Sequence, residues 1–207
     1  MWALVEDNAI TKIINNPKAM VIGDVRHSRN IFSFRWTNEE REAIGLYEIV
    51  FDNSNKRDEA YYNNTNQSFN FADEVATASY GSATAKLLED RNEVDEAGEP
   101  LLDDNGDQVV TKGLKSQKKD IIKQQASGLL TDTDWYNHKA LDDETFTIPA
   151  NITTYRANVR TKSNDMEVLI DACSTVDELA TLYKYVNTGT EENPVMERPL
   201  GEFPEAV

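Results

Sequence analysis

The sequence predicts an α+β fold, in which a β-rich module at residues 1–51 and a hairpin-rich middle region at 52–112 precede a bundle of short helices at 113–186. Three observations predict it. Short β-favouring runs alternate with turn residues in the first module, and acidic, turn-forming residues dominate the middle region. Beyond it, apolar residues recur at three- and four-residue spacing, as in amphipathic helices. The proline-rich residues 187–207 are expected to form an extended C-terminal arm.

The N-terminal module begins with a predicted hairpin. The runs "WALV" and "AITKII" flank Asp7 and Asn8, which both tolerate the positive φ of a tight turn. The run "KAMVI" predicts a third strand. Thr37 and Glu40 form a capping box for a short helix, and Gly45 is suited to end that helix before the strand "LYEIVF".

The middle region is acidic and rich in turns. Short strand signals surround Phe69, Phe71 and Val75. Between residues 89 and 107, nine of the nineteen residues are acidic and only Arg91 is basic. Turns are predicted at "AG" (97–98) and at "NG" (105–106), and an Asn-Gly pair between apolar runs is a strong hairpin signal. We therefore expect a double hairpin that projects into solvent.

A calcium site in the stretch "DDNGD" is not expected. Placing Gly106 at the sixth position of a calcium loop would put Leu101 first and Lys112 twelfth. Those two positions normally supply carboxylate ligands, so the hairpin is expected to be independent of metal.

Four helices are predicted in the third region, besides a short helix that carries Trp135 and Tyr136. The first carries a narrow apolar stripe after Leu114 and is expected to break at Ser127-Gly128. Pro149 is suited to open the second, and the run "NDMEVLIDAC" predicts the third. The fourth starts after Ser174 and Thr175, which stand at capping-box spacing from Asp177 and Glu178.

Residues that could carry catalysis are sparse. Asp134 and His138 could share a helix face, but no candidate nucleophile stands beside them, and the only other histidine is His27. Cys173 is a lone thiol in an apolar context, which favours a small buried side chain. The sequence therefore predicts no catalytic, cofactor-binding or metal-ligating residue, and a protein that is not an enzyme. A glycan-degrading enzyme that acts through two carboxylates stays a distant alternative.

An aromatic cluster follows the first helix of this region. Trp135 and Tyr136 come directly after the turn "LTDTD" and can bury a large area while keeping a polar tip. We interpret them as a latch that holds a short helix against the preceding long one, and a ligand platform is the alternative. The predicted latch residues are Leu130, Trp135, Tyr136, Pro149 and Tyr155.

Composition limits the partners. The formal net charge of -16 opposes contact with phosphate backbones or anionic membranes, so we expect neither nucleic-acid nor membrane binding. The apolar fraction of 39% suggests a small core or one shared with neighbours. We therefore expect a homo-oligomer or membership of a larger protein assembly.

The stretch from residue 122 to 160 resembles tail-fibre assembly and tail-associated proteins of tailed bacteriophages. Its pattern is a long helix, "L-x-x-T-D-W-Y", a proline-opened helix and "Y-R-x-x-V-R". In this chain the positions are Leu130, Thr133, Asp134, Trp135, Tyr136, Pro149, Tyr155, Arg156, Val159 and Arg160. The first 32 residues are more loosely similar to N-terminal modules of marine phage virion proteins.

The resemblance implies a viral protein of the tail, found in the virion and made in the host cytoplasm, with other tail proteins as partners. It supplies no catalytic residue. We expect a structural protein that joins or decorates the tail, tail fibre or baseplate. A tail-fibre assembly chaperone is the alternative.

The C-terminal arm contains three prolines, which prevent a continuous helix. It also carries four spaced apolar residues, Val195, Met196, Leu200 and Phe203. Such a segment is suited to an edge strand or groove of a neighbouring subunit, and a frayed terminus is the alternative.

Overall fold

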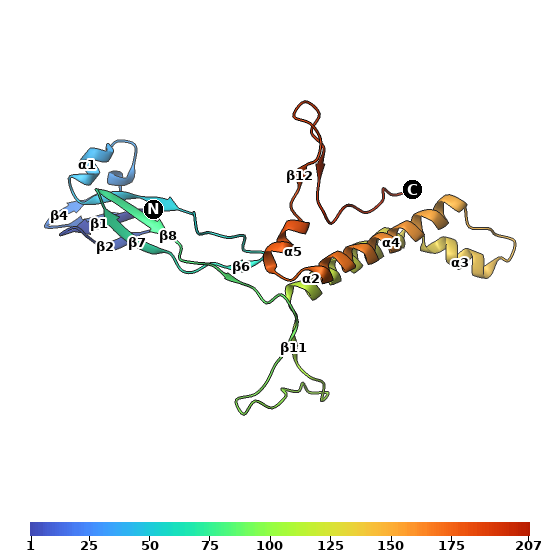
Figure 1. Ribbon diagram of the computed structural model, residues 1–207. Coiled ribbons are helices and arrows are strands. Elements are labelled where there is room, and N and C mark those ends of the chain that lie inside the picture. Colours follow the sequence, from blue (N-terminus) through green and yellow to red (C-terminus); the bar gives the residue numbers. More distant parts are fainter. The chain divides into compact units, whose positions relative to one another are not determined.

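The computed structural model describes all 207 residues, and the chain divides into two compact units, Met1–Thr84 and Ala85–Val207 (Figure 1). The first unit is built on a five-stranded sheet and the second on helices, which confirms the α+β fold class. Each unit has its own core and is described separately.

The first unit contains eight strands, one short 3-10 helix and one α-helix. These are β1 (Trp2–Glu6), β2 (Ala9–Ile14), β3 (Met20–Ile22), β4 (Val25–His27), η1 (Arg29–Phe32), α1 (Asn38–Glu42), β5 (Leu46–Asp52), β6 (Tyr62–Asn63), β7 (Ser68–Ala72) and β8 (Val75–Ser79). Strand β9 (Thr84–Ala85) spans the boundary between the units in the sequence.

The main sheet has the strand order β2-β1-β5-β8-β7. All neighbours pair antiparallel except β5 and β8, which are parallel. Two tight turns close its outer hairpins, and their central residues all have positive φ: Asp7, Asn8, Asp73 and Glu74. The hairpin predicted at Asp7-Asn8 is confirmed. Residues from both halves of the sheet, such as Ala3, Ile49 and Ala78, form one buried cluster.

The boundary predicted at residue 51 lies inside this sheet. Because β5 pairs with β8, residues 68–79 belong to the same hydrogen-bonded layer as the first strands. The N-terminal unit therefore extends to Thr84, and the acidic hairpins belong to the second unit.

The capping box predicted before α1 is also confirmed. The Thr37 hydroxyl accepts from the Glu40 amide, while the Glu40 carboxylate accepts from the Thr37 amide. Gly45 takes a φ of 78° before β5. A Cβ at Gly45 would lie 2.5 Å from the Val5 carbonyl oxygen, so this position has no room for a side chain.

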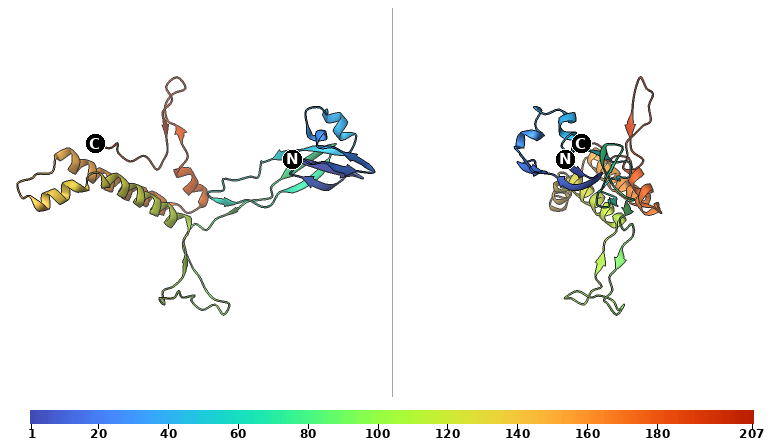
Figure 2. Two further views of the ribbon diagram at one scale, coloured as in Figure 1. Left: turned by 180° about the vertical axis from the view of Figure 1, so that it is seen from behind. Right: turned by 90° about the vertical axis from the view of Figure 1, so that its left-hand side faces the viewer.

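The second unit contains four helices and four short strands. These are β10 (Arg91–Asn92), β11 (Val110–Thr111), α2 (Leu114–Thr131), α3 (Asp134–Asp142), α4 (Ala150–Ala172), α5 (Val176–Leu182), β12 (Val186–Asn187) and β13 (Met196–Glu197). Helices α2 and α4 pack along each other, as Figures 1 and 2 show. Strands β10 and β11 form the stem of the acidic hairpins.

Two predictions about the helices are wrong. Helix α2 does not break at Ser127-Gly128, because it continues through Gly128 to Thr131. The predicted second and third helices are one helix, α4, whose buried positions include Val159, Ser163 and Met166. The small buried Ser163 keeps the packed face continuous through the polar sequence "TKSND", so the helix has no reason to end there. The capping box of α5, from Thr175 to Glu178, is confirmed.

Candidate functional site

The joint between α2, α3 and α4 is centred on Arg156, whose side chain is only 8% exposed. Its Nη1 donates to the Leu130 carbonyl at 2.9 Å and to the Thr133 hydroxyl at 2.6 Å. Its Nη2 donates to Asp134 Oδ1 at 2.7 Å. One side chain of α4 thus binds the end of α2, the turn and the start of α3. We call this arrangement the arginine joint.

The arginine joint follows from the end of α2. The last turn of any helix leaves carbonyl groups without intrahelical partners, and a cation there is favourable. Thr133 stands directly before α3 but makes no side-chain capping bond to it; its hydroxyl donates to the Leu130 carbonyl at 2.9 Å and accepts from Arg156. The turn is therefore held by groups from three segments.

An apolar cluster continues the joint along the two long helices. Tyr155, Val159 and Ala126 are buried together, with Leu130 partly buried against them. The Tyr155 hydroxyl donates to the Leu129 carbonyl at 3.2 Å. Two of the predicted latch residues, Leu130 and Tyr155, therefore lie in this cluster.

Trp135 and Tyr136 lie outside this cluster. Trp135 is 51% exposed and stacks on Tyr136, with ring centroids 3.8 Å apart. Phe146, from the loop after α3, completes the exposed aromatic group. Pro149 stands immediately before α4 rather than in its first turn. The buried pair that holds the helices together is therefore Arg156 and Tyr155. The prediction that Trp135 is buried in the latch is wrong, because its side chain is half exposed.

A shallow groove of about 520 Å³ runs beside the arginine joint. Eight of its ten lining residues are polar or charged, and the full set is Lys123, Ala126, Ser127, Leu130, Asp134, Arg156, Arg160, Ser163, Asn164 and Glu167. Lys123 and Glu167 face each other across it at 3.3 Å. The groove can accept a polar side chain or short peptide, but its best-placed cation, Arg156, is already occupied by three acceptors.

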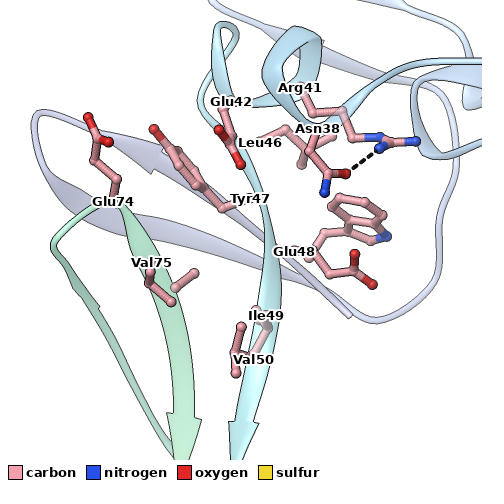
Figure 3. A pocket seen from close by; sticks show the side chains of 12 residues that line it. Asn38, Arg41, Glu42, Leu46, Tyr47, Glu48, Ile49, Val50, Glu74 and Val75 are labelled. Atoms are coloured by element: carbon pink, nitrogen blue, oxygen red, sulfur yellow. Dashed lines mark hydrogen bonds between the residues drawn. The ribbon is translucent and has the colours of Figure 1, made fainter.

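A second groove, of about 290 Å³, lies beside β5 in the first unit (Figure 3). The buried Arg41 stands at its edge and donates to Asn38 Oδ1 at 2.9 Å, as the dashed line marks. Its guanidinium also donates to the Ile31 and Ser33 carbonyls and lies 4.9 Å from the Trp2 ring centroid. Arg41 therefore orders the loop before α1.

The acidic hairpins form a three-way junction. Three backbone hydrogen bonds of 2.8–2.9 Å form a closed cycle. The Glu93 amide donates to the Val109 carbonyl, the Val109 amide donates to the Leu101 carbonyl, and the Leu101 amide donates to the Glu93 carbonyl. The side-chain amide of Gln108 donates to the same three carbonyls at 2.7–3.0 Å. One side of this junction is the β10–β11 stem, and the other two are the hairpins, which Figure 2 shows spreading apart. We call residues 89–111 the acidic arm.

The two hairpin turns of the acidic arm are built alike. Asp95 Oδ1 accepts from the amides of Ala97 and Glu99 at 2.8 and 2.9 Å. Asp103 Oδ1 accepts from the amides two and four residues later at the same distances. These backbone hydrogen bonds hold the pKa of the Asp103 carboxyl below its usual value, so its charge persists.

The likeness of the turns reflects an eight-residue repeat that the sequence reading missed. "VDEAGEPL" and "LDDNGDQV" share an aspartate at the second position and a glycine at the fifth. Both glycines, Gly98 and Gly106, have φ near 85°. Aligning the two turns at this short period would have revealed the repeat.

The start of α2 is capped from a distance. The Asp90 carboxylate accepts from the Gly113 amide at 2.8 Å and from the Ser116 hydroxyl at 2.9 Å. These bonds, the amide one first, lower the pKa of Asp90. A Cβ at Gly113 would lie 2.3 Å from the Glu89 carbonyl oxygen, so the acidic arm and α2 meet where only glycine fits.

The remaining candidate residues lie apart from one another. His27 packs edge-on against Trp36, with ring centroids 5.9 Å apart. Cys173 is buried, which raises the pKa of its thiol. No group of three or more His, Cys, Asp or Glu side chains is arranged to hold a metal ion. No helix combines the length and apolar character that crossing a membrane requires.

The C-terminal arm packs partly on its own unit. Leu200 is fully buried, and its amide donates to the Leu182 carbonyl at 3.0 Å. Phe203 packs against the Tyr155 cluster. These two residues therefore have an intramolecular role that the sequence reading did not expect. Val195 and Met196 stay 47% and 57% exposed, on a hairpin of their own.

Comparison with known proteins gives no relative. No protein-family model, curated protein or solved structure matches this chain.

Proposed function

We propose that the chain is a structural protein of a tailed-bacteriophage virion, which joins or decorates the tail, tail fibre or baseplate through protein–protein contacts. One observation carries the proposal. The positions that resemble tail-associated phage proteins meet in the arginine joint, although 22 to 26 residues separate Leu130, Thr133 and Asp134 from Arg156. The resemblance therefore covers residues that depend on one another in space.

The chemistry of the joint supports a structural role for these positions. Arg156 directs its donors at a helix end, a turn hydroxyl and a carboxylate of its own chain. A motif built this way fixes the angle between helices. Large apolar side chains that stay exposed, such as Phe34 at 95% and Val21 at 59%, supply surface for partners.

The test is mass spectrometry of purified particles of the phage that encodes the chain, with the infected-cell lysate measured in parallel. We expect the chain in particles at a constant ratio to a tail protein, through repeated density-gradient purification. Abundance in the lysate with absence from particles would overturn the proposal and favour an assembly chaperone.

Immunogold labelling of intact particles gives an independent readout. Antibody against α3 (Asp134–Asp142), which lies outside the acidic arm and has exposed residues, should label the tail or baseplate. Labelling confined to the capsid, or none on particles that contain the chain after denaturation, would contradict a tail position with an accessible α3.

A further inference from the structure

The first unit carries a local region of positive charge in an acidic protein. Residues 17–36, which we call the basic lobe, contain four basic residues and one acidic residue, although the whole chain has a net charge of -16. The basic residues are Lys18, Arg26, Arg29 and Arg35. Helix α1 directly after it is acidic again, so this run of positive charge ends where α1 begins.

Phe34 lies at the tip of the basic lobe and is 95% exposed. Its turn is held firmly: the Ser33 carbonyl accepts from Arg41 and from the Trp36 amide, and the Ser33 hydroxyl donates to Asn30 at 2.7 Å. A large aromatic side chain on an ordered turn loses little entropy on docking, which is the property of an interface anchor. Val21 and Val25, at 59% and 58% exposure, add apolar surface.

The acidic arm has the complementary character. It contains nine acidic residues and one basic residue. Exposed apolar side chains surround its junction, with Val94 56%, Leu101 42%, Leu102 55% and Val110 43% exposed. The closed cycle of backbone hydrogen bonds orders the arm in advance, which lowers the cost of docking.

We propose that the chain associates head to tail with copies of itself, the basic lobe of one copy docking on the acidic arm of the next. Opposite local charges and apolar groups on both surfaces match the composition of a specific interface. At physiological salt, charges more than about 8 Å apart are largely screened, so the overall negative charge opposes this contact only weakly. Because the two surfaces differ, the contact repeats and produces rings or filaments instead of a closed dimer.

The inference deepens the proposed function by naming one partner, and it rests on that function only for its setting in the particle. The test uses the purified full chain in sedimentation velocity over a concentration series at physiological salt. The lobe variant is Phe34→Ser with Arg35→Glu, and the arm variant is Leu102→Ser with Asp104→Lys. Leu141→Ser is the control, because Leu141 is 82% exposed outside both surfaces.

The wild type and the Leu141→Ser control should form species larger than a dimer of the 23.4 kDa chain. Each one-sided variant alone should associate at least tenfold more weakly. A mixture of the two variants should form a 1:1 dimer and nothing larger, because it retains one intact lobe and one intact arm. Circular dichroism of each variant checks that the fold is kept.

Three results would each overturn the inference: a monomeric wild type at every concentration, undiminished association of either variant, or a mixture without the 1:1 species. A loss of association in Leu141→Ser equal to that of the lobe variant would do the same. These results are independent of whether the chain is found in particles, so failure of this inference and failure of the proposed function are distinguishable.

Discussion

The arginine joint and the acidic arm differ in the origin of the hydrogen bonds that hold them. In the joint, a buried side chain of α4 reaches groups 22 to 26 residues earlier in the chain. In the arm, each turn is closed by an aspartate that binds amides two and four residues later. The joint therefore depends on tertiary packing, whereas the arm depends on its local sequence.

This difference predicts that substitutions in the two regions change the stability of the protein in different ways. Loss of a joint residue uncouples α2 from α4, and those helices carry the core of the second unit. Loss of a turn residue in the arm opens a hairpin whose side chains are already exposed. Substitutions in the joint should thus lower global stability, and those in the arm should act locally.

The largest effect is expected for Arg156→Ala, which removes three hydrogen bonds from a buried position. We expect the free energy of unfolding to fall by about 3 kcal/mol, because buried acceptors lose a charged donor while Asp134 can still be solvated. Urea denaturation followed by circular dichroism measures it. The control is Arg160→Ala, whose side chain is exposed one turn further along the same helix. Equal stability of the two variants would contradict the joint.

Gly113→Ala should come next, because its Cβ would press on the Glu89 backbone where the arm meets α2. We expect a loss of about 2 kcal/mol from overpacking against an atom that cannot rotate away. Gly128→Ala is the matched control, since a Cβ there has nothing within 4 Å inside α2. It should stabilise the protein by about 0.5–1 kcal/mol through helix propensity. Thermal melts measure both variants. A melting temperature that shifts in the same direction for Gly113→Ala and Gly128→Ala would refute this reasoning.

Trp135→Ala tests how far the exposed aromatic group belongs to the joint. Because Trp135 is half exposed and stacks mainly on Tyr136, we expect a loss of only about 1 kcal/mol, against about 3–5 for a buried tryptophan. Differential scanning calorimetry of this variant beside Arg156→Ala gives the ranking. A tryptophan variant less stable than the arginine variant would reverse the assignment of the latch.

The smallest effect is expected from Asp90, which caps α2 from the arm. Its pKa is lowered below the usual 3.8 in the folded state. The folded state thus binds this proton less readily than the unfolded state. The ionised Asp90 carboxylate therefore contributes its full stabilisation at pH values above the unfolded pKa of 3.8. That stabilisation should be lost as the pH falls through the folded pKa. Asp90→Asn should flatten the acid limb of the stability profile slightly, as urea denaturation at a series of pH values would show.

Local signals in the sequence predicted much of the fold. The positive-φ pair Asp7-Asn8 and the capping boxes at Thr37 and Thr175 act within a few residues, so their chemistry can be read directly. The continuity of α4 was missed because its polar middle looks like a break. The buried face nevertheless keeps three- and four-residue spacing through Val159, Ser163, Met166 and Ile170, with serine as a small packing residue.

The arginine joint could not be predicted in the same way. Hydrophobic periodicity assigns an arginine to the solvent side, and only the partners around Arg156 explain its burial. Aromatic size alone suggested that Trp135 would be inside, yet it finds its stacking partner on its own helix. Whether such a side chain is buried depends on which distant segments pack around it. A local sequence pattern does not contain that information.

The stem of the acidic arm has a consequence for how the chain can change during evolution. Asn92 and Val110 are paired across the β10–β11 stem. The two ends of the segment between them, residues 93–109, therefore lie as close together as neighbouring strands of a hairpin. Removing that segment, or exchanging it for a foreign loop, leaves ends that a short turn can reconnect, and exposed sites of this kind tolerate insertions best. A lineage could therefore acquire, lose or replace this appendage by recombination while α2 and α4 keep their packing.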